Sequence, residues 1–260
     1  VAFDPGDIQT TTGTNGYITK YNANGSYGWT KAFDVSATDT YANIAGVAID
    51  SHDNVFVAAN GVGTVVFDGS HSHTSDIDNS MIVKYSNSGS VLQVIADITG
   101  YTNPFSIAID ANDNVFMGGV WVGDVSFGGG ETMNPGSESA FVTKYSADGT
   151  YLWTRVNDSN SSSYVMGLTT DAAGNVYSIG RLSGTVAFDG LGGSDTRSTI
   201  NTTTYLSRYN ADGTYGWTKH IEAGTTGVAI GSAVAMDADG NLYFTGYTHG
   251  TSIFDGTDGS

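Results

Sequence analysis

The stretch DADGNLYFTG, residues 237–246, joins a short polar turn to an alternating apolar run. Three related stretches occur earlier in the chain: DSHDNVFVAA from Asp50, DANDNVFMGG from Asp110 and DAAGNVYSIG from Asp171. Aspartate and asparagine in such turns accept local backbone hydrogen bonds, and an alternating apolar run is typical of a β-strand. Each stretch therefore predicts a tight turn that leads into a strand, and its recurrence predicts a repeat.

A second marker shows that the repeat covers the whole chain. It reads VAFDPG at Val1, VVFDGS at Val65, VSFGGG at Val125, VAFDGL at Val186 and SIFDGT at Ser252. Cutting there divides a single domain, 1–260, into four units of 60–66 residues and a partial fifth: 1–64, 65–124, 125–185, 186–251 and 252–260. Recurrence at this period indicates repeated copies of one supersecondary unit.

Each unit contains four short alternating strands and no helical pattern. In the last full unit they read YLSRYN (205–210), YGWTKHI (215–221), AVAMD (233–237) and NLYFTG (241–246). Antiparallel units of this size fit the blades of a β-propeller better than a sandwich or a closed barrel. We predict an all-β propeller of four blades, with a β-solenoid or a fragment of a larger propeller as the alternatives.

The motifs AVAMDADGNLYFTG (233–246) and AFVTKYSADGTYLWTR (140–155) resemble the SBBP-type β-propeller repeat and, more loosely, NHL-type propellers. The resemblance covers essentially the whole chain. It implies that the AVAMD-type strand is innermost, followed by the NLY-type, TKY-type and GWTK-type strands. The two termini are then expected to complete one blade together. Those families usually close with more than four blades, and propellers host many unrelated functions, so the resemblance implies little about activity.

One marker strand is left over, because the marker occurs five times, once with Gly128 in place of its aspartate, and four blades need it four times. One interpretation is that the chain is cut from a longer array, or that one end is disordered. The other is that the surplus strand pairs with a neighbouring copy and builds a filament, tube or surface array head to tail. The candidate assembly residues are Val1, Ala2, Phe3, Asp4, Ser252, Ile253, Phe254 and Asp255.

Two copies of the turn motif have the oxygen spacing of half a calcium loop. Calcium takes six to eight oxygen ligands, so a turn with three oxygens needs further ligands from elsewhere. The other two copies have His52 and Ala173 at the middle position. We therefore favour a structural turn without metal or cofactor, and keep calcium as the alternative. The candidate ligands are Asp110, Asn112, Asn114, Asp237, Asp239 and Asn241.

Most basic and aromatic residues recur at fixed positions in the repeat, which favours a structural role. A cation precedes the tyrosine that ends each TKY-type strand, and a tryptophan recurs in the following strand of three units. We expect these aromatic residues to pack between blades, with glycan binding as the functional alternative. The recurring residues are Lys20, Lys84, Lys144 and Arg208; Tyr21, Tyr85, Tyr145 and Tyr209; and Trp29, Trp153 and Trp217.

The composition excludes several classes of function. A net charge of −17 disfavours nucleic acid and anionic membranes as partners. The chain has no cysteine and no run long enough to cross a membrane, and no catalytic or phosphate-binding constellation stands out. We expect a non-catalytic protein, extracellular or at a cell surface, that associates with copies of itself, with a glycan-binding propeller as the alternative.

Overall fold

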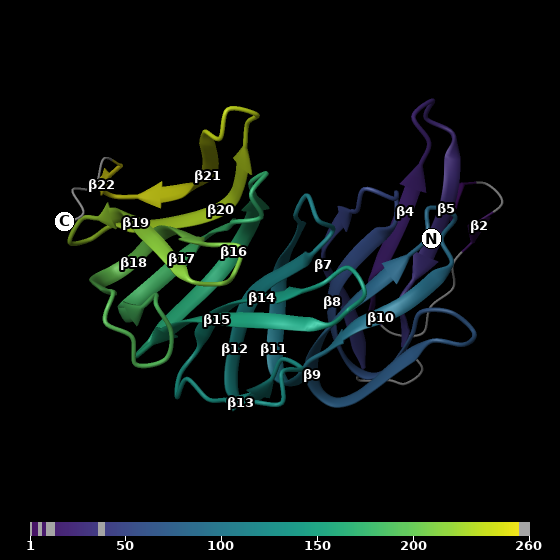
Figure 1. The fold of residues 1–260 in the computed structure, drawn as a ribbon, viewed down its shortest axis with the longest axis horizontal. Helices are drawn as coiled ribbons and strands as arrows, with labels where there is room; N and C mark the ends of the chain where they lie inside the picture. Colours follow the sequence, from purple (N-terminus) through teal and green to yellow (C-terminus); the bar gives the residue numbers. More distant parts are fainter. Residues whose placement is uncertain (1, 5–6, 9–13, 36–39, 255–260) are drawn as a thin grey trace.

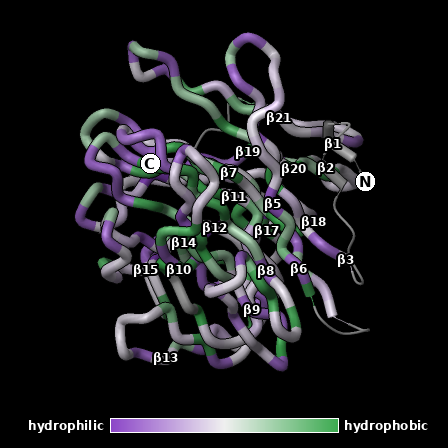
Figure 2. Tube along the Cα trace, turned by 90° about the vertical axis from the view of Figure 1, so that its right-hand side faces the viewer, coloured by the Kyte–Doolittle hydropathy of each residue, from purple (hydrophilic) through white to green (hydrophobic). Residues whose placement is uncertain are grey.

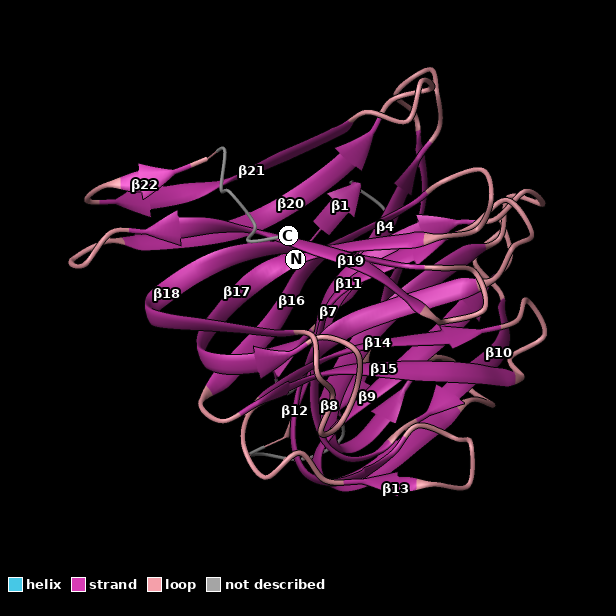
Figure 3. Cartoon of the chain, turned by 60° about the vertical axis from the view of Figure 1, so that its left-hand side comes forward, coloured by secondary structure: helices cyan, strands magenta, loops and turns pink. Residues whose placement is uncertain are grey.

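The computed structural model describes residues 2–4, 7–8, 14–35 and 40–254. Its strands form successive blades along an open arc, with the two ends of the chain on opposite sides of the molecule (Figure 1). The described residues include no helix (Figure 3). The prediction of an all-β propeller architecture is confirmed.

Three complete blades follow one another, and each is a four-stranded antiparallel meander. From the inner to the outer edge, blade 1 consists of β7 (Tyr41–Ile49), β8 (Val55–Val66), β9 (Ser72–Tyr85) and β10 (Val91–Asp97). Blade 2 consists of β11 (Thr99–Ile109), β12 (Val115–Ser126), β14 (Ser139–Tyr145) and β15 (Tyr151–Ser159), and β13 (Thr132–Met133) pairs with β12. Blade 3 consists of β16 (Ser162–Thr170), β17 (Val176–Ala187), β18 (Thr196–Tyr209) and β19 (Tyr215–Ala223). This strand order confirms the predicted order within a blade.

The remaining strands form two half-blades. The C-terminal half-blade pairs β20 (Val228–Met236) with β21 (Leu242–His249), which are inner strands by sequence. The N-terminal half-blade pairs β4 (Tyr17–Tyr21) with β5 (Tyr27–Ala32), which are outer strands by sequence. Five strands of two or three residues complete the set: β1 (Ala2–Asp4), β2 (Asp7–Ile8), β3 (Thr14–Asn15), β6 (Asp34–Val35) and β22 (Ser252–Ile253).

The expected joining of the two termini in one blade is not observed among the described strands. Instead, β20–β21 and β4–β5 are separate two-stranded sheets, placed at opposite ends of the long axis (Figure 1). The curvature follows from the close approach of successive inner strands. A Cβ on Gly46 of β7 or on Gly167 of β16 would lie 3.1–3.2 Å from the inner strand of the next blade. Three such steps, from β7 through β11 and β16 to β20, produce an arc and not a ring.

The turn motif positions the second strand of each blade. The aspartate that begins it accepts backbone hydrogen bonds from the residues two and four positions later, as Asp171 does from Ala173 and Asn175. The fourth position is left-handed, and it is occupied by glycine or by the less usual aspartate. Those residues are Asp53, Asp113, Gly174 and Gly240, with φ of 63°, 61°, 81° and 85°.

The hydrophobic core lies mainly between neighbouring blades. The apolar residues follow the middle strands of the blades, whereas hydrophilic residues occupy the turns (Figure 2). Between blades 1 and 2 the largest cluster surrounds Trp121, whose ring lies 5.3 Å from that of Phe127. Phe127 in turn lies 5.0 Å from Phe141. Each blade is therefore stabilised largely by the faces of its neighbours.

Candidate interaction site

Strand β21 forms an edge of the C-terminal half-blade. Among the described strands it pairs with β20 alone. Tyr243, Phe244 and Tyr247 on this strand are 62%, 38% and 58% exposed. At the position of Tyr243, the complete blades 1 and 2 have Phe56 and Phe116, both fully buried. An edge strand with exposed aromatic residues is a template for pairing with another strand.

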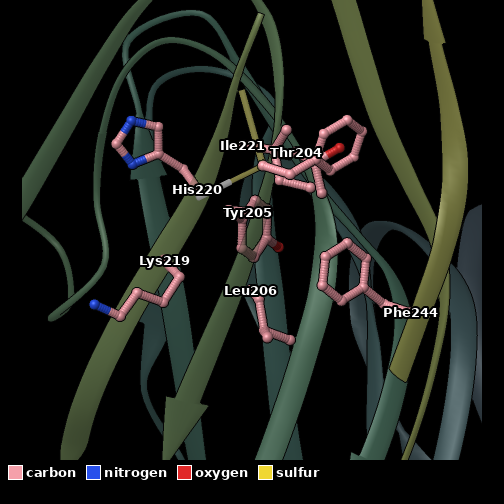
Figure 4. Close-up of a pocket in the computed structure, with 8 residues that line it drawn as sticks. Thr204, Tyr205, Leu206, Lys219, His220, Ile221 and Phe244 are labelled. Carbon is pink, nitrogen blue, oxygen red and sulfur yellow. The ribbon is translucent and has the colours of Figure 1, made fainter. Parts of the chain in front are cut away.

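A hollow lies beside this edge, between blade 3 and the C-terminal half-blade. It consists of two adjoining cavities of about 320 and 370 Å³ that share Thr204, Ile221, Phe244 and Phe254. Figure 4 shows Leu206 and Ile221 of blade 3 on one side and Phe244 of β21 on the other. Phe254 is 66% exposed, although its equivalents Phe67, Phe127 and Phe188 are at most 3% exposed. The hollow is thus an apolar surface that the complete blades fill.

Two aromatic residues of the third strand fill the corresponding space in blade 3. Tyr205 and Tyr209 are both fully buried. Their hydroxyls donate to backbone carbonyls, Tyr205 to Tyr164 at 2.9 Å and Tyr209 to Phe188 at 2.9 Å. Burial raises the pKa of the Tyr209 hydroxyl well above its usual range. These neutral tyrosines close the core between blades 2 and 3.

The N-terminal half-blade has the same internal pairing as the outer half of a complete blade. Thr19 pairs with Thr30 and Lys20 with Trp29, as Thr143 and Lys144 pair with Thr154 and Trp153 in blade 2. The hydroxyls of Thr19 and Thr30 lie 3.0 Å apart, and those of the blade 2 pair 2.9 Å apart. Tyr17 and Tyr21 correspond to the buried Tyr205 and Tyr209, yet each is 56% exposed. The N-terminal half-blade therefore has the hairpin of the two outer strands of a blade, but none of the described inner strands pairs with it.

The repeated lysine connects two groups in the complete blades. Lys144 Nζ lies 3.2 Å from the Asp110 carboxylate of its own blade and donates to the Ala211 carbonyl of the next blade at 3.1 Å. Lys84 lies 3.4 Å from Asp50 in the same way. The repeated lysine thus pairs with the aspartate of the turn motif in its own blade, which is a structural role of the kind expected for a recurring cation.

In the half-blades the repeated lysine and the aspartate of the turn motif are separated. Lys20 donates to the Asn87 carbonyl of blade 1 at 3.1 Å, which is the contact to the next blade. Its counterpart aspartate, Asp237, belongs to the C-terminal half-blade. Hydrogen bonds from the side chain and backbone of Asn241 lower the pKa of the Asp237 carboxyl, so it is an anion at neutral pH. A lysine and an aspartate that are paired in the complete blades thus belong to two separate sheets, β4–β5 and β20–β21.

The calcium candidates form hydrogen-bonded turns. In blade 2, Asp110 accepts from the backbone of Asn112 and from the backbone and side-chain nitrogens of Asn114. Asp237 accepts in the same way from Asp239 and Asn241. The asparagine side chains therefore present their nitrogen atoms to the aspartate. These hydrogen bonds hold each turn together, which is the structural role that the sequence favoured. Calcium binding stays a prediction for the six candidate ligands Asp110, Asn112, Asn114, Asp237, Asp239 and Asn241.

One contact between turns was not expected. The Asp113 carboxylate of blade 2 accepts from the Ser51 backbone at 2.8 Å and its hydroxyl at 2.7 Å, and lies 3.1 Å from His52 Nδ1. Within the described residues, one group of three aspartate or histidine side chains has ligand atoms close enough together to share a cation. It consists of Asp50, His52 and Asp113. The donors around Asp113 link blades 1 and 2. The unusual aspartate at a left-handed position was the available signal in the sequence.

The surplus marker strands are paired within the chain where they are described. Ser252 and Ile253 pair with Ala223 and Glu222 of β19. The N-terminal marker, Ala2–Asp4, forms a short hairpin with Asp7–Ile8. Val1 and Asp255 lie outside the described residues. Of the predicted assembly residues, Phe254 is the one that lines the hollow.

Of the recurring aromatic residues, Trp29 and Trp153 pack between blades, as expected. Trp29 donates to the Asn87 carbonyl at 2.9 Å and Trp153 to the Ala211 carbonyl at 3.2 Å. In blade 1, where glutamine replaces tryptophan, Gln93 donates to the Asp148 carbonyl at 3.0 Å. Each contact joins an outer strand to the hairpin turn of the next blade. The next turn after blade 3 would belong to a fourth outer half-blade.

Comparisons with known proteins agree with this architecture. No protein-family model matches the chain. A WD repeat-containing protein of Acanthamoeba polyphaga mimivirus, itself uncharacterized, is 29% identical over a 212-residue alignment that covers 71% of this chain and 15% of the relative. The described residues contain no helix long and apolar enough to span a bilayer. Taken with the three meander blades, this similarity to a WD repeat protein supports a β-propeller-like repeat fold for the chain.

Proposed function

We propose that the protein is a non-catalytic interaction module that associates with copies of itself head to tail. The observation that carries this proposal is the pair of complementary half-blades, one at each end of the arc. A surface that complements a different surface of the same chain makes a heterologous contact, which repeats from copy to copy. The result is an open filament or a closed ring of subunits.

The charge of the chain supports a place outside the cell or at its surface. With 26 acidic and 9 basic residues, the molecule is shielded best where cations are abundant. Assembly is then expected to strengthen as salt rises to about 0.15 M, since screening reduces the repulsion between copies. Fractionation of the source cells with an antibody tests the location separately from assembly.

The test is the size of the native particle. Light scattering after size-exclusion chromatography, from low to high micromolar concentration, is expected to show masses above 27.0 kDa that grow with concentration. Negative-stain electron microscopy of the same samples is expected to show rings or chains of subunits. A single 27.0 kDa species at every concentration and salt level would overturn the proposal.

Glycan binding is the second candidate function. The observation in its favour is that Tyr243 and Tyr247, four residues apart on β21, are exposed together. Exposed aromatic rings stack on sugars, whereas the recurring Trp29 and Trp153 serve packing between blades. A glycan array that gives no signal with the wild-type protein, or equal signals for wild type and Tyr243→Ala, removes this candidate.

A further inference from the structure

We propose that β21 pairs with strand β4 of a second copy, so that the two half-blades form one composite blade across the contact between copies. This inference rests on the proposed self-association and specifies its geometry. The partner is identified by three features on the two half-blades: the strand register, the hollow beside β21, and the separated lysine and aspartate.

The register follows from the complete blades. In blade 3 the second strand pairs with the third from Val176↔Tyr209 to Gly180↔Tyr205. Blades 1 and 2 use the same register, with Val55↔Tyr85 and Val115↔Tyr145. The repeat places Leu242 at the position of Val176. The composite blade therefore has the pairs Leu242↔Tyr21, Tyr243↔Lys20, Phe244↔Thr19, Thr245↔Ile18 and Gly246↔Tyr17.

This register brings the exposed tyrosines to the hollow. Tyr205 and Tyr209 fill the space between blades 2 and 3, and Tyr17 and Tyr21 are their counterparts on β4. The lining of the hollow includes the apolar side chains of Leu206, Ile221 and Phe244 beside the polar Lys219 and His220. Phe254 takes the position of Phe188, whose carbonyl accepts from Tyr209. The side chains of Tyr17 and Tyr21, each 56% exposed in the single copy, would then be buried between blade 3 and the composite blade.

The same register restores the charge pair. Lys20 of the second copy would meet Asp237 and lie over the Tyr243 ring, as Lys144 meets Asp110 and lies 4.8 Å from the Phe116 ring centroid. Its existing bond to the Asn87 carbonyl is the one that Lys144 makes to Ala211. The lysine already holds one of its two partners, and the second copy supplies the other.

A further contact forms outside the new blade. Trp153 packs on the hairpin turn of blade 3, since a Cβ on Gly213 would meet its ring at 2.9 Å. Trp217 of β19 is the equivalent residue facing the next turn. That turn, Asn22–Gly25, belongs to the N-terminal half-blade, and a Cβ on Gly25 would meet no atom within 4 Å. Docking would place this turn under Trp217.

A second copy fits better than the chain's own N-terminal half-blade. In the structure that half-blade packs on blade 1 through Trp29 and Phe33, whose rings lie 6.4 and 6.3 Å from Tyr85. It lies at the far end of the long axis from β21 (Figure 1). Pairing within one chain would require the arc to close, whereas pairing between copies continues the same curvature.

Disulfide crosslinking tests the register, because the native chain has no cysteine. Equal amounts of the single variants Thr19→Cys and Phe244→Cys are mixed and oxidised, as are Ile18→Cys and Thr245→Cys. Two adjacent pairs are used because successive antiparallel pairs alternate between wide and narrow spacing. We expect a covalent heterodimer from at least one mixture, and at least tenfold less product from the control mixture of Thr19→Cys with Thr248→Cys.

Charge and side-chain variants test the contacts. Tyr17→Asp is expected to weaken self-association about 30-fold, the usual effect of losing a buried tyrosine at an interface. The matched control is Tyr101→Asp, at a 54% exposed tyrosine of blade 2, which should leave association unchanged. Lys20→Glu should weaken association, because it places a second carboxylate beside Asp237. Lys20→Arg, which copies Arg208 at the same position of blade 3, should leave association unchanged.

The outcomes are distinguishable. If particles assemble but no mixture crosslinks in register and the Tyr17 variant associates normally, the composite blade is wrong while the proposed function stands. If the double variant Thr19→Cys and Phe244→Cys gives only a crosslinked monomer, the chain closes on itself and the second copy is excluded. If the wild-type protein remains a single copy at every concentration, both proposals fail.

Discussion

Blade 2 and the two half-blades have the same strand motifs, but they differ in burial. Phe141 and Tyr145 of blade 2 are 1% and 2% exposed, whereas their counterparts Tyr17 and Tyr21 are each 56% exposed. The hairpin registers and the cross-strand threonine pair are the same in both regions. Local sequence is therefore sufficient to form each hairpin, and the pairing of the second strand with the third is what buries the aromatic residues.

The largest difference is expected in the aromatic core. Phe141→Ala should lower the free energy of unfolding by about 3–5 kcal/mol, because it leaves a cavity among Trp121 and Phe127. Tyr17→Ala, at the equivalent position, should cost less than about 1 kcal/mol in the single copy. Urea unfolding at low protein concentration measures both. Equal costs would show that Tyr17 is already buried in solution.

The ion pair gives the next contrast. Lys144→Met should destabilise the protein by about 3 kcal/mol, because it leaves the Asp110 carboxylate buried without its counter-charge. Lys20→Met removes a lysine that lies far from Asp237 and should cost about 0.5 kcal/mol or less. The denaturant midpoints of the two variants, each compared with that of the wild type, measure these two losses of stability. A large loss for Lys20→Met would mean that the composite pair forms at the concentration used.

A smaller effect is expected from single hydroxyl groups. Tyr209→Phe removes hydrogen bonds to the Asn157 side chain and the Phe188 carbonyl, both in a buried setting. Such a loss should cost about 1–2 kcal/mol. Tyr21→Phe should cost less than about 0.5 kcal/mol, since that side chain is largely in contact with water. Thermal melts of both variants are the measurement, and identical shifts would contradict the contrast.

Acid should weaken the turns. Burial raises the pKa of Asp171, but hydrogen bonds from the Asn175 side chain and backbone outweigh it, so the folded-state pKa is lowered from 3.8. Asp50 behaves in the same way through Asn54. A lowered pKa gives stability that is present above pH 3.8 and is lost as the pH falls through the folded-state values. Melting temperatures between pH 6 and pH 2.5 should fall in that range, and less steeply for Asp171→Asn.

Calcium should have the smallest effect. Because the aspartate oxygens of the turns already accept N–H groups, a chelator should shift the melting temperature by less than about 1 °C, within the effect of a neutral surface change. The variants Asn112→Ala and Asp239→Ala should respond alike. A higher melting temperature in calcium that disappears in either variant would instead establish a metal site.

The repeat made most of the fold predictable. The order of strands in a blade, the hairpin turns and the packing of Trp29 and Trp153 all followed from positions that recur at a fixed period. The open arc did not, because the rotation between blades depends on how closely the inner strands approach, as at Gly167. The exposed edge of β21 followed from that geometry. The role of Asp113 was missed because its contact with Ser51 and His52 depends on residues that the other repeats do not have at those positions.

The link that Lys144 makes between Asp110 and the Ala211 carbonyl has a consequence for how such chains grow. Both partners of the lysine are supplied by every repeat, so each unit presents the next with the same set of contacts. In a repeat protein whose units contact only their neighbours, stability adds up unit by unit. A gene duplication that inserts one whole unit would therefore leave no cation or aspartate without its partner, and the arc would lengthen by one blade.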